Sequence, residues 1–257
     1  MSESADPIIR SELTAGSAAR TAVTTTVRFR PDLEVDASEV ALVDANASVL
    51  AAARPWREFR WRAGQKHYSG TYWSATDDRH VIYESRLELA RVLFADFDRS
   101  VHRICAQPFL LTKRSNGVER KHIPDYLLIT DQGPKVVDIK PAHRLSRPEV
   151  VDTFAWTRAA LERRGWIYEV WSEPNEVELQ NIRFLAGFRR SYLFNPSLLV
   201  ALSSVEPDGA SIAETIRMVP DWPLPLTRAA LLHLLWSQEF AVDLCRPLRS
   251  SSTLTRR

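Results

Sequence analysis

The chain has 257 residues, of which 45% are hydrophobic, so it can form one sizeable domain and a smaller one. A net charge of +2 excludes a strongly basic or acidic protein, and Cys105 and Cys245 show neither a metal-binding nor a disulfide spacing. The N-terminus lacks a signal-peptide pattern, and no stretch approaches eighteen apolar residues. We therefore expect a cytoplasmic protein without a membrane partner.

Residues 1–52 are rich in Ala, Ser, Thr and Asp, contain no tryptophan, and predict a flexible leader. Residues 51–130 carry fourteen basic and nine acidic groups. A locally positive region of this kind suits a polyanionic partner, although a solvated arginine-rich surface explains it equally well.

The middle of the chain predicts alternating elements in a clear order. A strand pair, an amphipathic helix and three strands of a meander are expected at residues 56–74, 83–96, 100–113, 120–130 and 135–141. Pro148 then fits the first turn of a helix that ends before Gly165, and a buried strand follows at 166–172. The order helix, three strands, helix, strand predicts a mixed-sheet α/β core.

A further helix is expected at 179–194, and the stretch around residue 205 reads as a domain boundary. Beyond it, two short helices and a strand or wing are similar to a winged helix-turn-helix module. The predicted domains are therefore a leader at 1–52, a core at 53–204 and a winged-helix-like module at 205–257.

Three charges are placed in the two strands where burial is expected. Asp125 and Asp138 lie on neighbouring strands, and Lys140 shares a strand face with Asp138 because strand side chains alternate with period two. Two adjacent carboxylates in a low-dielectric site repel each other, and a divalent cation resolves the repulsion. Oxygen ligands with open positions for water and phosphate suit Mg²⁺ or Mn²⁺.

A third ligand is expected from the preceding helix, where Glu84 and Glu88 are four residues apart and so share one face. A bound divalent cation lowers the pKa of its water, which then attacks a phosphodiester, while Lys140 stabilises the charge of the transition state. The pattern therefore predicts a hydrolytic nuclease site.

Each residue also has a purely structural interpretation. Asp125 follows Pro124 at a strand entry, Asp138 and Lys140 can form a cross-strand salt bridge, and Glu88 can be a solvated helix position. Three histidines flank the site and are expected to be surface or phosphate-contacting residues: His102, His122 and His143. Three arginines are candidates for contacts to the DNA backbone, or simply solvate a helix: Arg144, Arg147 and Arg158.

This order of elements and residues resembles the PD-(D/E)xK nuclease superfamily, with its αβββαβ restriction-endonuclease-like core. Within it, "ESRLELARVLFADFD", "CAQPF", "HIPDYLL" and "VVDIKPA" resemble TnsA-like endonuclease subunits of heteromeric transposases, over about residues 55 to 195. The resemblance implies that Glu88, Asp125 and Lys140 are catalytic, with Asp138 at the third ligand position, where some members carry glutamine. Glu84 remains the alternative helix ligand.

The resemblance also implies a function and partners. Family members cut double-stranded DNA at the 5′ ends of a transposon, while a DDE-type transposase acts on the 3′ ends, and their C-terminal region engages an AAA+ ATPase regulator and DNA. Two alternatives stay open: a stand-alone restriction-type or repair nuclease, and a catalytically silent DNA-binding scaffold. The intact carboxylates and lysine argue against the scaffold.

Overall fold

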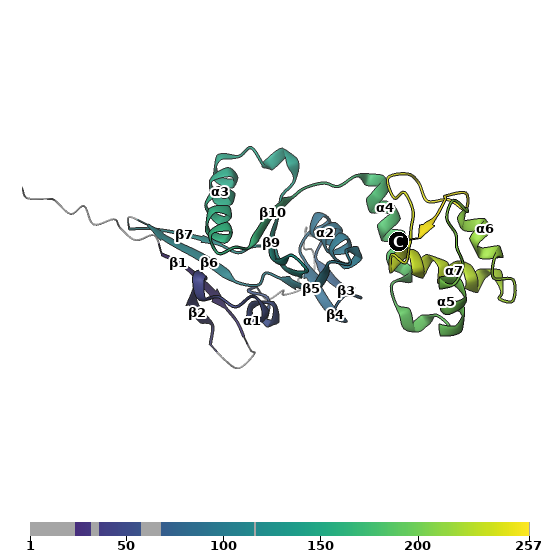
Figure 1. Cartoon of the computed structure of the whole chain (residues 1–257). Helices are drawn as coiled ribbons and strands as arrows, with labels where there is room; N and C mark the ends of the chain where they lie inside the picture. The colour runs from purple at the N-terminus through teal and green to yellow at the C-terminus, as the bar shows by residue number, and fades with distance from the viewer. Residues whose placement is uncertain (1–23, 32–35, 58–67, 116, 257) are drawn as a thin grey trace, which may run out of the picture.

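The computed structural model describes residues 24–31, 36–57, 68–115 and 117–256. A four-stranded mixed sheet forms its centre, in the order β10-β9-β8-β5 (Figure 1). The strands are β5 (Val101–Ala106), β8 (Tyr126–Thr130), β9 (Gly133–Ile139) and β10 (Ile167–Trp171). β5, β8 and β9 pair antiparallel, whereas β9 and β10 are parallel and are joined by α3 (Pro148–Arg163). The predicted α/β class with a mixed sheet is confirmed.

The two faces of this sheet pack into different cores because successive strand residues point to opposite sides. Tyr126 and Leu128 belong to one cluster of buried residues with α2 (Arg86–Phe97), while Leu127 between them belongs to another, which includes residues of α3. α3 begins at Pro148 and is followed by Gly165 in the left-handed region (φ 79°), as the sequence predicts.

A second sheet, in the order β2-β1-β6-β7, corrects the predicted leader. Its strands are β1 (Thr24–Phe29), β2 (Ser38–Ala41), β6 (Leu110–Ser115) and β7 (Val118–His122), and η1 (Leu42–Asp44) and α1 (Ala47–Ala52) accompany them. Val27, Leu42 and Leu50 are buried beside residues of the central sheet. A flexible leader over 1–52 is therefore wrong for the part from residue 24 onward that the structure describes; residues 1–23 lie outside it.

The meander is also more divided than expected. The run at 100–113 breaks at Gln107 and Pro108 into β5 and β6, which belong to different sheets, and the run at 120–130 breaks into β7 and β8. Gln107 adopts a left-handed backbone (φ 45°), which turns the chain from one sheet to the other. The β6–β7 hairpin is thus inserted between two paired strands of the central sheet.

The strand pair expected at 56–74 lies partly outside the described residues, because its first strand would fall on 58–67. What the structure describes is a hairpin of β3 (Gly70–Ser74) with β4 (Arg79–Tyr83), immediately before α2. Asp96 of α2 fixes this hairpin, since its carboxylate accepts hydrogen bonds from the hydroxyls of Tyr72 and Ser74 at 2.7 and 2.6 Å.

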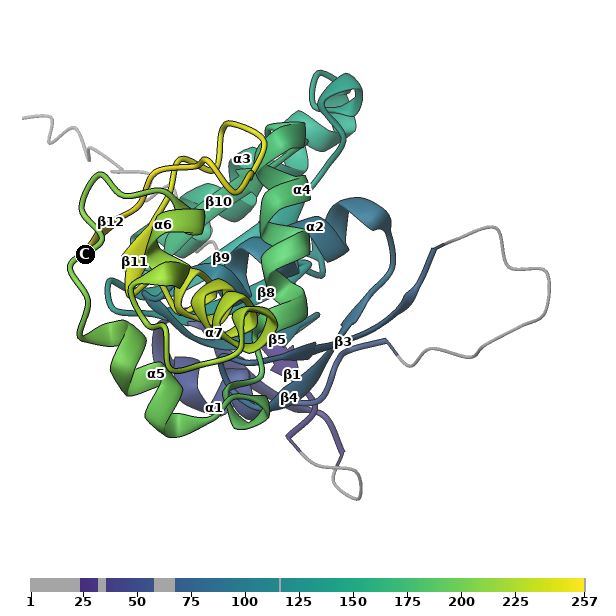
Figure 2. The ribbon, with the colours of Figure 1, turned by 90° about the vertical axis from the view of Figure 1, so that its right-hand side faces the viewer.

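Helices gather at one end of the molecule after β10 (Figures 1 and 2). They are α4 (Glu176–Leu185), η3 (Ala186–Phe188), η4 (Ser191–Leu193), α5 (Pro196–Ser203), α6 (Ile212–Arg217) and α7 (Leu224–Trp236). β11 (Phe240–Ala241) pairs with β12 (Thr255–Arg256) in the place of the expected strand or wing.

Helix α5, which precedes the boundary predicted near residue 205, contacts helix α7, which follows it. Leu198 and Leu202 of α5 are buried in the same cluster as Leu231 and Leu234 of α7, so α5 packs with the helices that follow it. The Asn181 amide of α4 donates to the carbonyls of Leu244 and Arg246. None of the helices in the described ranges combines the length and apolar character needed to cross a membrane.

Candidate active site

A polar cavity of about 540 Å³ opens at the end of β9 and the start of β8. Its lining brings together every residue that the sequence predicts as a metal ligand or catalytic group: Glu84, Glu88, Asp125, Asp138 and Lys140. These residues come from the chain around the start of α2 and from both strands of the β8–β9 hairpin. The fold thus brings together side chains that are more than fifty positions apart in the sequence.

Strand register explains how the two aspartates meet. Tyr126 pairs with Val137, so Asp125, just before β8, lies opposite Asp138 on β9. The backbone N–H of Ile139 donates to Asp125 Oδ2 at 2.6 Å, which fixes the carboxylate across the hairpin. Lys140 follows the last residue of β9 and has the same parity as Asp138.

Asp138 is the most deeply buried carboxylate of the site, with 1% of its surface exposed. Its Oδ2 accepts from His122 Nε2 at 2.7 Å and from the Tyr168 hydroxyl. Burial, and then the charge of Asp138, hold the pKa of Tyr168 far above its ordinary value, so the phenol remains a donor. Oδ1 is buried and has no hydrogen-bond partner among the residues that the structure describes.

Burial is the main reason why the pKa of Asp125 lies well above its usual range, and the negative charge of Asp138 raises it further. Glu88 adds to the rise, while the backbone N–H of Ile139 and the ammonium of Lys140 oppose it. Two facing carboxylates in a buried position are unfavourable when both are ionised, and a cation between them removes this penalty.

Glu88 is engaged in capping α2. Ser85 is the N-cap, and its hydroxyl accepts from the Glu88 N–H at 3.1 Å, while Glu88 Oε1 and Oε2 accept from Ser85 Oγ and the Glu84 N–H. This is close to a capping box, whose S-x-x-E signature is present in the sequence. Burial raises the pKa of Glu88, and Lys140 opposes the rise.

Glu84 corrects a prediction. α2 begins at Arg86, so Glu84 precedes the N-cap and does not share a helix face with Glu88. Its side chain instead accepts from Gln107 Nε2 and lies 3.8 Å from the Arg57 guanidinium. Both glutamates still line the cavity, but Glu88 does so from the first turn of α2 and Glu84 from the chain before it.

Gln107 is a site residue that our sequence reasoning did not single out. Its N–H donates to the Asp125 carbonyl at 2.8 Å, and its side chain joins Glu84 to the N–H of Arg57. The residue before a proline rarely adopts a left-handed backbone, and such outliers concentrate at functional sites. The Gln-Pro pair was the available signal.

His122 and Tyr168 were also missed as partners of Asp138. His122 was expected at the surface or against phosphate, but it ends β7 beside Asp138. Tyr168 lies on the parallel strand β10, and Trp156 of α3 packs edge-on against His122 with ring centroids 6.3 Å apart. These contacts join strands that are distant in sequence, so only the fold shows them.

The residues present fit a divalent cation in part. Asp125 and the free Oδ1 of Asp138 offer hard oxygen donors, and Mg²⁺ is commonly held by one or two carboxylates with water and phosphate oxygens completing its shell. Within the described residues, no group of three or more His, Cys, Asp or Glu side chains has the arrangement of a metal site. The donor set is thus a pair of aspartates, with Glu88 committed to the helix cap.

The predicted DNA-contacting arginines fall into two kinds. Arg144 in η2 (Ala142–Arg144) and Arg147 at the N-cap of α3 are exposed and follow directly after Lys140. Arg158 is engaged within the protein: its guanidinium lies 4.9 Å over the Tyr168 ring and donates to the Tyr168 carbonyl at 3.2 Å. Arg144 and Arg147 are therefore the better placed to meet a ligand at the cavity.

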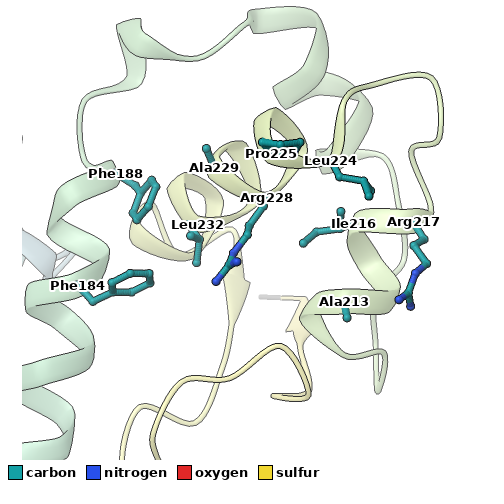
Figure 3. A pocket seen from close by; sticks show the side chains of 10 residues that line it. All are labelled: Phe184, Phe188, Ala213, Ile216, Arg217, Leu224, Pro225, Arg228, Ala229 and Leu232. Atoms are coloured by element: carbon teal, nitrogen blue, oxygen red, sulfur yellow. The ribbon is translucent and has the colours of Figure 1, made fainter.

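A second hollow, in the C-terminal helices, has the opposite character. This apolar groove of about 590 Å³ lies between η3, α6 and α7, and Figure 3 shows Phe184 and Phe188 on one side and Ile216 on the other. Among the described residues, its charged lining residues are Arg217 and Arg228. The groove holds no carboxylate or other group suited to hydrolysis, so the polar cavity is the candidate active site.

No protein-family model matches the chain, and a search of curated proteins finds no significant match. The function is therefore inferred from the cavity and from the resemblance of the sequence motifs.

Proposed function

We propose that the protein is a metal-dependent DNA endonuclease that hydrolyses a phosphodiester in the polar cavity. One observation carries the proposal: Asp125 and Asp138 face each other across the β8–β9 hairpin, with Lys140 at the same edge of the sheet. A hydrophobic core gains nothing from two facing carboxylates, one of which keeps a buried, unpaired oxygen. A bound divalent cation would compensate the two negative charges, and Lys140 would contact the phosphate.

The order of elements supports a PD-(D/E)xK core. α2, β5, β8, β9, α3 and β10 follow one another in the αβββαβ order of that superfamily, with the β6–β7 hairpin inserted after β5. Asp125 precedes the second of these strands, Asp138 and Lys140 lie at the end of the third, and Glu88 lies in the first helix.

Each group in the cavity has a defined task. Asp125 and Asp138 would hold Mg²⁺ or Mn²⁺, which supplies an activated water and neutralises charge on the phosphate. Lys140 stabilises the extra negative charge of the phosphoryl oxygens in the transition state. His122 and Tyr168 fix Asp138 through Oδ2 and leave Oδ1 without a hydrogen-bond partner among the described residues, so that it would be available to a cation.

The biological setting rests on the sequence resemblance to TnsA-like subunits. On that basis the enzyme is the cytoplasmic nuclease subunit of a heteromeric transposase, which cuts the 5′ ends of a transposon beside a DDE-type partner and under an AAA+ ATPase. The C-terminal helices with the β11–β12 pair take the part of the winged-helix module in this proposal.

The test is nicking of supercoiled plasmid by the purified protein with Mg²⁺ or Mn²⁺, alone and with a DDE-type transposase as the proposed partner. We expect metal-dependent nicking that is lost in Asp125→Asn. Asp131→Asn is the matched control, because Asp131 lies on the turn of the same hairpin and is exposed. DNA binding without nicking under any condition would make the protein a silent scaffold, and nicking independent of any partner would favour a stand-alone nuclease.

The same assay separates the two glutamates. Glu88→Gln retains an oxygen that can accept in the cap of α2 but removes the charge, and Glu84→Gln does the same at the loop before it. We expect the larger loss of nicking from Glu88→Gln. The charge of Glu88 raises the pKa of Asp125, and the charge of Lys140 lowers the pKa of Glu88, so Glu88 interacts directly with the catalytic groups. A larger loss from Glu84→Gln would move the role to that residue.

A further inference from the structure

A second charged cavity, of about 510 Å³, lies where α2 meets the C-terminal helices. We call it the arginine cavity, defined by Arg86, Arg183 and Arg189 with Tyr68 and Tyr72. Arg86 comes from α2, Arg183 from α4 and Arg189 from the residue after η3. α2 and α4 lie side by side in both views (Figures 1 and 2).

The charge of this cavity is uncompensated. Among the described residues, no acidic side chain lines it, and no ion pair involves its three arginines. Three guanidinium groups around one hollow repel each other, and an anion bound between them removes the repulsion. Guanidinium forks match phosphate oxygens in two parallel hydrogen bonds, which makes phosphate the best-suited anion.

Two of the arginines are held in place by aromatic rings. Arg189 lies 4.9 Å over the Tyr72 ring, and its Nε and Nη1 donate to the carbonyls of Trp73 and Ala186, so it adds positive charge to the cavity while Arg86 and Arg183 supply the donors for a ligand. Arg86 lies 5.0 Å over the ring of Tyr68, which is 53% exposed. Such stacking orders the guanidinium before a ligand arrives.

The position of Arg86 is not explained by helix stability. It is the first residue of α2, where the helix dipole disfavours a cation. Glu84 and Glu88, which line the polar cavity, lie two residues before and two after it. The two cavities therefore lie on different sides of the start of α2, because helix residues two apart do not face each other.

We propose that the arginine cavity binds backbone phosphates of the DNA strand beside the phosphodiester held in the polar cavity. A strand presents a phosphate about every 3.4 Å along its axis, so a strand that passes the start of α2 presents phosphates to both cavities. The inference rests on the proposed function for the identity of the polyanion.

The test is the affinity for a fluorescein-labelled short DNA duplex, measured without divalent cation over a series of salt concentrations. In Arg86→Gln/Arg183→Gln we expect about tenfold weaker binding at ~0.1 M salt, and a slope of log K against log salt smaller by about 2, since each phosphate contact contributes about 0.9. Both side chains are exposed, so the fold is retained, which circular dichroism checks.

Arg217→Gln/Arg228→Gln is the matched control, because it removes the same charge from the lining of the apolar groove. An unchanged slope in the arginine-cavity variant, or an equal decrease in the control, would overturn the proposal. Poly-glutamate is added as a competitor in the same assay. If the variant no longer binds poly-glutamate but binds DNA as wild type does, the cavity binds an acidic protein segment and the proposal is wrong.

Because binding is measured without metal, the result is independent of cleavage. If wild type never nicks plasmid but the variant shows the smaller slope, the nuclease proposal fails and the DNA subsite stands. If wild type nicks plasmid and the variant binds DNA as wild type does, the subsite fails alone.

Discussion

The polar cavity and the apolar groove are similar in size and opposite in chemistry. The cavity buries charge: Asp138 is 1% exposed and keeps an oxygen without a partner among the described residues. The groove exposes apolar surface, with Leu224 61% and Phe184 46% exposed. Buried charge lowers stability unless a ligand compensates it, whereas exposed apolar side chains alter stability little. The comparison therefore identifies the polar cavity, and not the apolar groove, as the region whose side chains suit catalysis.

The largest expected effect is on catalysis at the cavity. Lys140→Ala removes an ammonium that lowers the pKa of both Asp125 and Glu88, and we expect kcat for plasmid nicking to fall by about 100-fold or more. Lys135→Ala is the matched control, since Lys135 lies on the same strand and pairs with Glu169 at 3.7 Å. Equal activity of the two variants would contradict the role given to Lys140.

A smaller effect is expected on metal affinity. Tyr168→Phe removes one donor from Asp138 Oδ2 without changing the buried ring, and we expect Mn²⁺ to bind about tenfold more weakly. Tyr126→Phe is the control: that buried tyrosine is on the same sheet, but its hydroxyl donates to the Ile82 carbonyl at 2.9 Å. If both variants lose Mn²⁺ affinity equally, the hydrogen bond from Tyr168 to Asp138 has no specific role in metal binding.

Part of the fold and of the candidate site could be predicted from the sequence. α3 was predicted with its first and last turns because Pro148 and Gly165 act locally on the backbone. The meeting of Asp125 and Asp138 followed from strand parity and one hairpin turn. Features that depend on neighbours along the chain were thus predicted; the cap of Ser85 and Glu88 was missed, although its S-x-x-E spacing is a local signal.

The remainder depends on contacts between distant segments. His122 and Tyr168 reach Asp138 from β7 and β10, across 16 and 30 positions. The burial of Val27 and Leu50 against the central sheet has no local signal in a stretch rich in Ala and Ser. The break at Gln107 depends on a left-handed backbone that few residues adopt before proline.

The next effect is on stability and its pH dependence in the metal-free protein. The pKa of Asp125 is raised in the folded state, so the folded protein binds the proton more tightly than the unfolded one. Its contribution to stability is present below pH 4, near the ordinary pKa of 3.8, and is lost as the pH rises through the folded value. At neutral pH we expect Asp125→Asn to be more stable than wild type, by on the order of 1 kcal/mol.

Urea unfolding of both proteins across this pH range measures the difference, which should grow as the pH rises. Addition of Mg²⁺ should stabilise wild type alone, by about 2.7 kcal/mol at a hundredfold excess over Kd. An Asp125→Asn variant that is less stable than wild type at neutral pH without metal would instead support the structural interpretation of Asp125.

The smallest effect is expected at the groove. Leu224→Ser makes one exposed side chain of its lining polar, and we expect the free energy of unfolding to change by less than about 0.5 kcal/mol. Nicking should be unchanged. Thermal unfolding and the plasmid assay check both, and a large loss of nicking would mean that the two regions are coupled.

The most direct test of the central claim is calorimetric titration of Mn²⁺ into wild type and into Asp138→Asn in the presence of a short DNA duplex. We predict one bound ion in wild type and at least tenfold weaker binding in the variant, because the free Oδ1 of Asp138 is replaced or neutralised. Equal binding in the two proteins, or no binding in wild type, would contradict the assignment of the aspartate pair as a metal site.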